Sequence, residues 1–291
     1  MQLFSFGPLP SKADLAYLAK LKGLAGISVT TTAGAMQKSY KGPISFQIYD
    51  QASAAAKSIS KQLYFRAHFG DGCPKDLPGQ VTLPGSCYSS GPTQPKSVTL
   101  PFPTDPVYQT YVDGFIAALG AHCNGDPTLA YQSACGPSRQ GEDVEPTCPE
   151  WLALCTKNGL TAPRLLSIWE HDFALYRKYF PAHITTFGME NPMGILAGQL
   201  AYLKTLGVAN FLCQQNGLRS TSAIGPKSPW GQAKALGFAI GAQTWGDVAQ
   251  GNGPLATTLS IAKAGGLKLV EVYAQDVLNP ANAAMIGQYG S

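Results

Sequence analysis

Three glutamates of this chain stand where short apolar runs end or are interrupted, and acids in such places can do chemistry. Glu142 closes the polar loop that follows the apolar run Leu129–Cys135. Glu190 follows a second apolar run, and Glu271 lies inside a third, Leu267–Tyr273. A carboxyl group that gives up a proton, paired with a carboxylate that attacks or activates water, is a common catalytic arrangement. The chain has only 17 acidic residues, so the candidate pairs are few.

Each of these glutamates also has a structural explanation. A buried carboxyl group without a partner is costly, so Glu271 either serves catalysis or pairs with Arg66 through an ion pair or hydrogen bond. Glu190 could be an acid favoured by the dipole at a helix N-terminus. Glu142 could be a solvated acid of its loop. We take Glu142 as the candidate general acid, Glu271 as the candidate second carboxylate and Glu190 as the next candidate.

Uncharged and basic side chains near the same run ends are candidates for binding. Arg66 and His68 alternate near the end of a run, so both point to one side, where they could bind a hydroxyl group or tune a carboxylate. A histidine with structural partners only is the alternative. Gln215 and Asn216 offer paired donors and acceptors, although an ordinary turn at Asn216-Gly217 explains those two residues equally well.

The elements that would position these residues are eight β-like runs, each followed by a helical pattern. The runs are Leu3–Phe6, Gly26–Thr31, Gln62–His68, Leu129–Cys135, His183–Phe187, Val208–Cys213, Gly237–Ala242 and Leu267–Tyr273. A capping box at Ser11 predicts the first helix. Strands that alternate with helices imply parallel pairing, and eight repeats imply closure. We predict an α/β fold, a (β/α)8 TIM barrel forming one domain over residues 1–291.

Loop lengths favour the barrel over its rival, an open doubly wound sheet. No GxGxxG follows the first run and no phosphate loop occurs, and the absence of both motifs argues against an open doubly wound sheet. The connections that leave the runs are long, at residues 70–103, 136–162 and 214–228, whereas those that enter are short. Barrels carry their sites on the face with the long loops. The loop from Gly70 has almost no helix or strand signal, which suggests a lid or a cleft wall.

Composition excludes several classes of function. Of the residues, 45% are hydrophobic and 13% charged, and the net charge of +4 is spread thinly, so nucleic acid is not an expected partner. No apolar stretch could cross a membrane, and the N-terminus has no signal-peptide pattern. With four histidines and no paired ligand spacing we expect no metal and no cofactor. The sequence contains no GxSxG motif, so a serine nucleophile is not expected. The sequence leaves the oligomeric state open.

The seven cysteines suggest where disulfides form. Cys73 and Cys87 flank a loop rich in Pro, Gly and Ser, and Cys148 and Cys155 bracket another short segment. Each pair would close a loop that is poor in core residues, so we predict the disulfides Cys73–Cys87 and Cys148–Cys155. Cys135 and Cys213 lie in apolar runs and should be small buried hydrophobes. Low charge together with two disulfides favours a secreted or periplasmic protein.

Several stretches of the chain resemble (β/α)8 glycoside hydrolases of the β-galactosidase and cellulase kind. They are Asp105-Pro-Val-Tyr108 with the helix through 115–119, Asp126-Pro-Thr-Leu129 ahead of the fourth run, and Tyr49-Asp50 with the third run. The resemblance implies an acid/base Glu at the end of the fourth strand, which Glu142 matches loosely. It implies a nucleophilic Glu at the end of the seventh, where this chain has Gln243. An amide cannot attack an anomeric carbon, so this chain diverges at the nucleophile.

Glycosidic bond cleavage needs one acid and one carboxylate, and the resemblance implies that chemistry on a polysaccharide or oligosaccharide. Aromatic rings stack on the apolar faces of sugars, and Trp230, Trp245 and Trp151 are expected in loops, whereas Trp169 fits a helix core. The substrate site would be lined by Arg66, His68, Gln215, Asn216, Gln243, Trp230 and Trp245. The alternative is a catalytically inactive barrel that binds carbohydrate. A lyase or isomerase would need a phosphate site or metal ligands that the sequence does not show.

Overall fold

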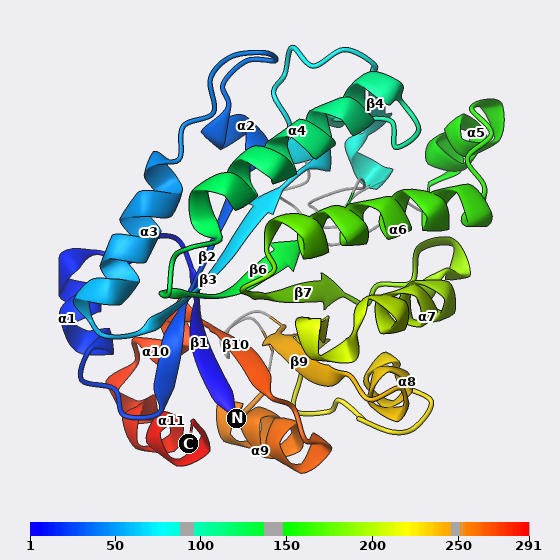
Figure 1. Cartoon of the computed structure of the whole chain (residues 1–291). Coiled ribbons are helices and arrows are strands. Elements are labelled where there is room, and N and C mark those ends of the chain that lie inside the picture. Colours follow the sequence, from blue (N-terminus) through cyan, green and yellow to red (C-terminus); the bar gives the residue numbers. More distant parts are fainter. Residues whose placement is uncertain (88–95, 137–147, 246–250, 252, 291) are drawn as a thin grey trace.

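A computed structural model of the whole chain describes residues 1–87, 96–136, 148–245, 251 and 253–290. Eight strands close into a barrel in which each neighbouring pair is parallel (Figure 1). They are β1 (Gln2–Gly7), β2 (Leu24–Thr32), β3 (Gln62–His68), β6 (Leu129–Ala134), β7 (Ile184–Gly188), β8 (Phe211–Leu218), β9 (Ala239–Thr244) and β10 (Leu269–Tyr273). Strand order around the barrel follows chain order. The predicted (β/α)8 TIM barrel is therefore confirmed.

Helices surround the strands, and the two chain ends lie on the same side of the molecule (Figure 1). The helices are α1 (Lys12–Leu18), α2 (Ala33–Met36), α3 (Gln47–Ser58), α4 (Pro106–Cys123), α5 (Pro149–Lys157), α6 (Ala162–Tyr179), α7 (Leu196–Leu206), α8 (Pro229–Ala235), α9 (Leu255–Gly265), α10 (Ala274–Val277) and α11 (Ala283–Tyr289). Short 3-10 turns cover Gly70–Gly72, Gly85–Cys87, Pro192–Gly194, Val208–Asn210 and Pro280–Asn282. None of the described helices combines the length and the apolar character that a membrane span requires.

Local sequence signals explain several helix starts. The predicted capping box is present: the Ser11 hydroxyl accepts a hydrogen bond from the Asp14 backbone, and the Asp14 carboxylate accepts one from the Ser11 backbone. Proline occupies the first turn of α4, α5, α6 and α8, where its missing N–H costs nothing. These starts set where each helix packs on the barrel.

The barrel interior is apolar at its N-terminal end. Side chains alternate across each strand, and the inward ones form a small core of Phe4, Tyr64, Tyr131, Leu212 and Leu269. The Tyr131 hydroxyl reaches Gln2, the first residue of β1, which locates this core at the start of the strands. Gly26 of β2 leaves room for it, since a Cβ there would lie 2.3 Å from the Phe4 ring. We call these five residues the apolar plug, and polar side chains begin above it.

The sixth predicted strand was placed too early. The structure has a 3-10 turn at Val208–Asn210, and β8 then continues to Leu218. Asn216 and Gly217 therefore lie within a strand and form no turn: Asn216 and Leu218 pair with β9, and Gly217 is the bulge between them. The error arose because Val208 is apolar, and an apolar residue fits the end of a turn as well as a strand.

The long connection after β3 is not featureless, as the sequence suggested. It contains an antiparallel hairpin of β4 (Gln80–Pro84) and β5 (Ser97–Pro101). Each strand has a valine, a threonine and a leucine in alternation, and the leucines, Leu83 and Leu100, are buried. Thr82 and Thr99 hydrogen-bond across the pair at 3.0 Å. This alternation is the sequence signal that predicts such a hairpin.

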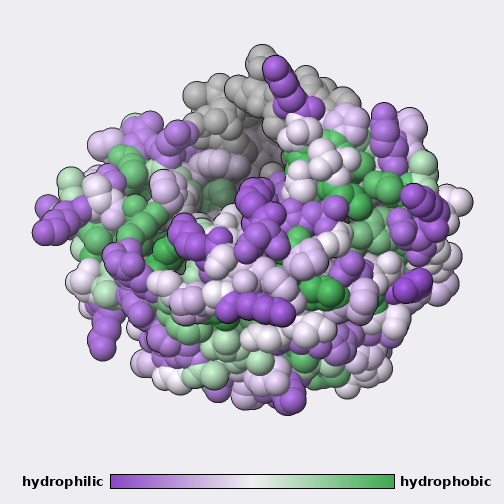
Figure 2. Space-filling view, turned by 90° about the horizontal axis from the view of Figure 1, so that it is seen from above, coloured by the Kyte–Doolittle hydropathy of each residue, from purple (hydrophilic) through white to green (hydrophobic). Residues whose placement is uncertain are grey.

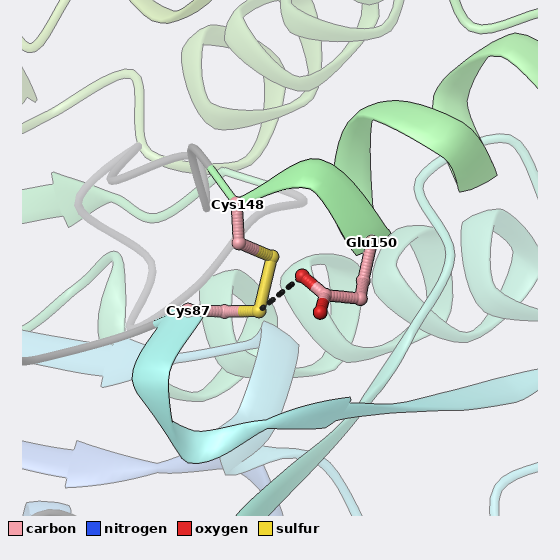
Figure 3. Close-up of side chains that lie close together, drawn as sticks. All are labelled: Cys87, Cys148 and Glu150. Atoms are coloured by element: carbon pink, nitrogen blue, oxygen red, sulfur yellow. Dashed lines mark hydrogen bonds between the residues drawn. A yellow bond between two sulfur atoms is a disulfide. The ribbon is translucent and has the colours of Figure 1, made fainter.

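Both predicted disulfides are wrong. The bond joins Cys87 to Cys148, with the two Cα atoms 4.9 Å apart, and thereby ties the hairpin segment to the N-terminus of α5 (Figure 3). Cys148 caps α5 and Cys155 lies two turns further along that helix, about 10 Å away, which is too far for a disulfide. Cys73 and Cys155 are buried thiols, and so, as predicted, are Cys135 and Cys213.

The carboxylate of Glu150 comes within 3.8 Å of the Cys87 sulfur (Figure 3). Together with Cys148 these side chains are close enough to share a metal ion. Both sulfur atoms are committed to the disulfide, however, so this group of three ligand atoms does not form a metal centre.

Candidate active site

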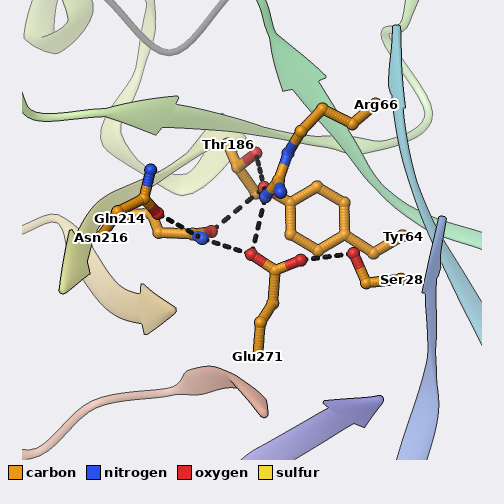
Figure 4. A network of polar contacts seen from close by, with 7 residues as sticks. All are labelled: Ser28, Tyr64, Arg66, Thr186, Gln214, Asn216 and Glu271. Carbon is orange, nitrogen blue, oxygen red and sulfur yellow. Dashed lines mark hydrogen bonds and ion pairs between the residues drawn. The ribbon is translucent and has the colours of Figure 1, made fainter. Parts of the chain in front are cut away.

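Glu271 lies in the middle of the barrel, above the apolar plug. Its side chain is fully buried, and its Oε2 atom receives a hydrogen bond from Arg66 Nη2 at 2.6 Å (Figure 4). Arg66, on β3 across the barrel, is itself 2% exposed. Of the two explanations offered by the sequence, the ion pair with Arg66 is confirmed.

Other inward side chains complete the surroundings of this carboxylate. Ser28 of β2 donates to Oε1 of Glu271, and the Gln214 amide of β8 donates to Oε2 (Figure 4). Three donors therefore converge on this carboxylate, and each of its two oxygens has a hydrogen-bond partner.

A tyrosine hydroxyl joins this network to the opposite wall. Tyr64 accepts from Arg66 at 2.6 Å, donates to the Gln214 carbonyl at 3.0 Å and lies 2.6 Å from the Thr186 hydroxyl of β7 (Figure 4). Burial raises the pKa of Tyr64, and the Arg66 charge lowers it only in part, so the phenol keeps its proton. The middle of the barrel thus contains a network of polar contacts that joins side chains of β2, β3, β7, β8 and β10.

The next layer faces the mouth, at the carboxyl ends of the strands, and consists of uncharged groups. Gln243 of β9 is almost fully buried and is in register with Glu271 on one side and Asn216 on the other. The Asn216 carbonyl accepts from the Gln214 amide at 3.4 Å. Both Asn216 and Gln243 therefore face the barrel interior in register with Glu271, and their part in substrate binding stays a prediction.

His68 is the last residue of β3 and lies above Arg66 on the same face of the strand. Burial, helped by the nearby Arg66 charge, lowers the pKa of His68 to about 3. Its Nε2 atom is buried and has no hydrogen-bond partner among the residues that the structure describes. The imidazole is therefore neutral at ordinary pH and can offer one donor and one acceptor.

Comparisons with known proteins show which solved structures have a similar fold. No family model and no curated protein matches the sequence. Among solved structures, the cellulase XacCel5A superposes with a TM-score of 0.58 at 12% identity, over 97% of this chain and 90% of that one. The catalytic domain of β-amylase from Paenibacillus polymyxa gives 0.56 at 12% identity, over 99% and 97% of the chains.

Both solved structures therefore share the (β/α)8 barrel fold of this chain. At this identity the comparison concerns the backbone alone, so each functional residue must be judged from its own position in this chain.

Trp245 lies at the mouth of the barrel. It follows β9 directly and is 52% exposed. The Arg219 guanidinium lies 4.2 Å from the centre of its ring, and Gly217 packs beneath it, where a Cβ would come within 3.1 Å. The ring is thus held in place while part of its surface stays open, which suits the apolar face of a sugar.

The other predicted loop tryptophans are structural. Trp230 lies on α8, is 5% exposed and donates its indole N–H to the Gly241 carbonyl at 2.8 Å. Trp151 lies on α5, almost fully buried, with its ring 5.2 Å from that of Phe102. Both expectations failed because a loop was predicted where a short helix forms. Trp169 is buried in α6, as predicted.

The β8 side chains also required a correction. Gln214 and Asn216 hydrogen-bond to each other inside the barrel, so Gln215 between them faces the helices. Gln214, which was not among the candidates, instead hydrogen-bonds Glu271 and Tyr64 inside the barrel. Ser28, Tyr64 and Thr186 were missed as well. Alternation along β2, β3 and β7 would have identified them once the strand starts were known.

Glu190 lies at the rim of the mouth, two residues after β7 ends. The explanation as a helix N-terminal acid is wrong, since α7 begins only at Leu196 and its first turn has no acid. The backbone that follows is strained: Asn191 and Met193 have φ values of 61° and 47°. Strain of this kind concentrates at functional sites. Glu142 lies outside the described residues.

Proposed function

We propose that this protein hydrolyses glycosidic bonds of a polysaccharide or oligosaccharide at the mouth of its barrel. The observation that carries the proposal is the layer of uncharged hydrogen-bonding side chains at the mouth (His68, Asn216 and Gln243) beside the exposed ring of Trp245. Sugar hydroxyls need paired donors and acceptors, and their C–H faces need an aromatic surface. Figure 2 shows a hollow on one face of the molecule, with both hydrophilic and hydrophobic residues along its border.

We assign the acid to Glu142 and the second carboxylate to Glu190. In the sequence, Glu142 comes eight residues after the end of β6 and Glu190 two residues after the end of β7, and these two strands are neighbours in the barrel. Glu271 is a weaker candidate than the sequence suggested, because it is fully buried and already accepts three hydrogen bonds. In this proposal Glu271 is a positioning residue that holds Arg66 and Gln214 below the substrate.

The proposed substrate class is a glucan or a related glycan. XacCel5A is a cellulase, and the second structural neighbour is a β-amylase. These are properties of the neighbours, and they guide the choice of substrates to be tested. The disulfide Cys87–Cys148 supports an exported protein, because disulfides persist in oxidising compartments.

A second candidate is a barrel that binds carbohydrate without cleaving it. Two observations favour it: Gln243 occupies the strand where the related enzymes have a nucleophile, and the Glu271 carboxylate is inaccessible. A binding barrel needs the mouth layer but no acid.

One experiment separates the two candidates. Purified protein is incubated with cellulose, starch and their oligosaccharides, and reducing ends are measured beside calorimetric titration of the same oligosaccharides. The hydrolase predicts product, and Glu142→Gln and Glu190→Gln should each lower the rate by at least about a hundredfold while binding is kept. The control is Glu170→Gln on α6, which should behave as wild type. Heat of binding without product from the wild type would establish the binding barrel.

A further inference from the structure

A cleft of about 450 Å³ lies beside the mouth layer, at the carboxyl ends of three neighbouring strands, β10, β1 and β2. It is lined chiefly by Phe6, Pro8, Thr30, Tyr273, Ala274 and Gln275. Pockets of this size that are mostly apolar, with a few placed polar groups, are typical of small-molecule sites. Nothing in the proposed function uses this cleft.

Two aromatic rings form its walls. Phe6 and Tyr273 meet edge to face with their centres 5.2 Å apart. The Arg66 guanidinium lies 5.6 Å from the centre of the Phe6 ring, so this residue is packed on more than one side. A wall fixed in this way loses little conformational entropy when a ligand binds against it.

Polar groups in the cleft are few. The Thr30 hydroxyl has no hydrogen-bond partner among the described residues, and Gln275 contributes an amide. The described lining contains no Asp, Glu, Lys, Arg or His. A charged ligand would lose its hydration there without gaining a counter-charge. A sugar ring has a hydroxyl on most of its carbons and would leave several of them unpaired. The cleft fits an apolar ring with one hydrogen-bonding group.

The cleft is also close to the proposed chemistry. Arg66 contacts Phe6 of the cleft wall and binds Glu271 at the barrel centre, so one side chain joins the two. A group held in the cleft therefore lies next to a sugar held over the mouth layer. We propose that the cleft binds the aromatic aglycone of a glycoside, so that aryl glycosides are a second class of substrate for this site, beside the glycans proposed above. This inference rests on the proposed function.

The test measures ligand binding in the cleft separately from catalysis. Phenol is titrated into the full chain by ligand-observed NMR, with cyclohexanol as a non-aromatic probe of similar size. Phenol should bind in the millimolar range and cyclohexanol at least several-fold more weakly. Ala274→Phe, which fills the cleft, should abolish the phenol signal, and Thr30→Val, which keeps the shape, should weaken it roughly fivefold. Ala201→Phe, at an exposed position of α7, is the control and should change nothing.

A kinetic measurement tests whether the cleft contributes to substrate binding during turnover. Hydrolysis of 4-nitrophenyl glycosides should show a KM raised at least about tenfold in Ala274→Phe, with the wild-type KM in Ala201→Phe. Equal binding of phenol and cyclohexanol, or phenol binding that survives Ala274→Phe, would overturn the inference even if oligosaccharides are cleaved. Cleft-specific phenol binding without any sugar release would instead remove the proposed function and leave the aromatic site standing.

Discussion

At the scale of single residues, the most constrained group is the Glu271 carboxylate. It is fully buried between Arg66, Ser28 and Gln214, which come from three other strands. Removing one partner of a buried ion pair leaves an uncompensated charge, which costs more than the pair itself contributes. A substitution in this pair should therefore affect the stability of the fold more directly than it affects catalysis.

Replacing this carboxylate tests its role. Glu271→Gln should lower the free energy of unfolding by about 3–5 kcal/mol, because the Arg66 guanidinium loses its counter-charge in the barrel interior. Urea denaturation measures the change. The control is Asp113→Asn, which breaks an exposed pair with His171 and should cost less than about 1 kcal/mol. If Glu271→Gln were as stable as wild type and had no activity, Glu271 would return to the catalytic pair.

His68 gives a pH-dependent prediction. The unfolded chain protonates this residue near pH 6.5, whereas the folded protein resists protonation down to about pH 3. Stability that is present above pH 6.5 should therefore fall as the pH drops toward 3, by at most about 1.4 kcal/mol per pH unit. His68→Gln should have a flatter curve over this range in denaturation measured between pH 7.5 and 4.5. The exposed His171→Gln is the matched control, and parallel curves for wild type and His68→Gln would contradict the prediction.

The sequence offered part of this site. Arg66, His68, Asn216 and Gln243 were predicted to line the substrate site; the structure places all four side chains inside the barrel, and their contact with a substrate stays a prediction. Whether Glu271 was accessible could not be decided locally, since its depth depends on how far seven other strands extend beside it.

At the scale of elements, the strands and helices were predictable where a cap or a regular period marked them. β3 was predicted with its observed bounds, and α1 from its capping box. β8 was misplaced, because an apolar turn precedes it, and the hairpin β4–β5 was overlooked. The disulfide predictions were wrong because they paired cysteines that are close in sequence, although helix α5 holds Cys148 and Cys155 apart.

The observed disulfide gives a prediction at this scale. Peptide mapping without reductant should find Cys87 linked to Cys148. The double variant Cys87→Ser/Cys148→Ser should lose about 2–4 kcal/mol of stability, because the bond closes a loop with a sequence separation of 61. Cys73→Ser/Cys155→Ser keeps the bond and is the comparison for it. A mapped link between Cys73 and Cys87 would refute the observed pairing.

At the scale of the whole molecule, the closed barrel sets the direction of every functional group. Because all eight strands are parallel, their carboxyl ends meet at one mouth, and long loops gather there. Closure was predictable from eight alternating repeats, which are a property of the entire chain. The distances between residues of different loops were not, because loop conformations depend on contacts that no local pattern encodes.

The most direct measurement is a crystal structure of the Glu142→Gln variant soaked with an oligosaccharide that the wild type cleaves. We expect the sugar over the mouth layer, with the residue 142 amide and the Glu190 carboxylate on either side of one glycosidic bond. A separation of about 5 Å would indicate a covalent intermediate, and about 6.5–9.5 Å direct attack by water. A sugar bound away from the mouth, or Glu190 directed away from it, would contradict the proposed active site.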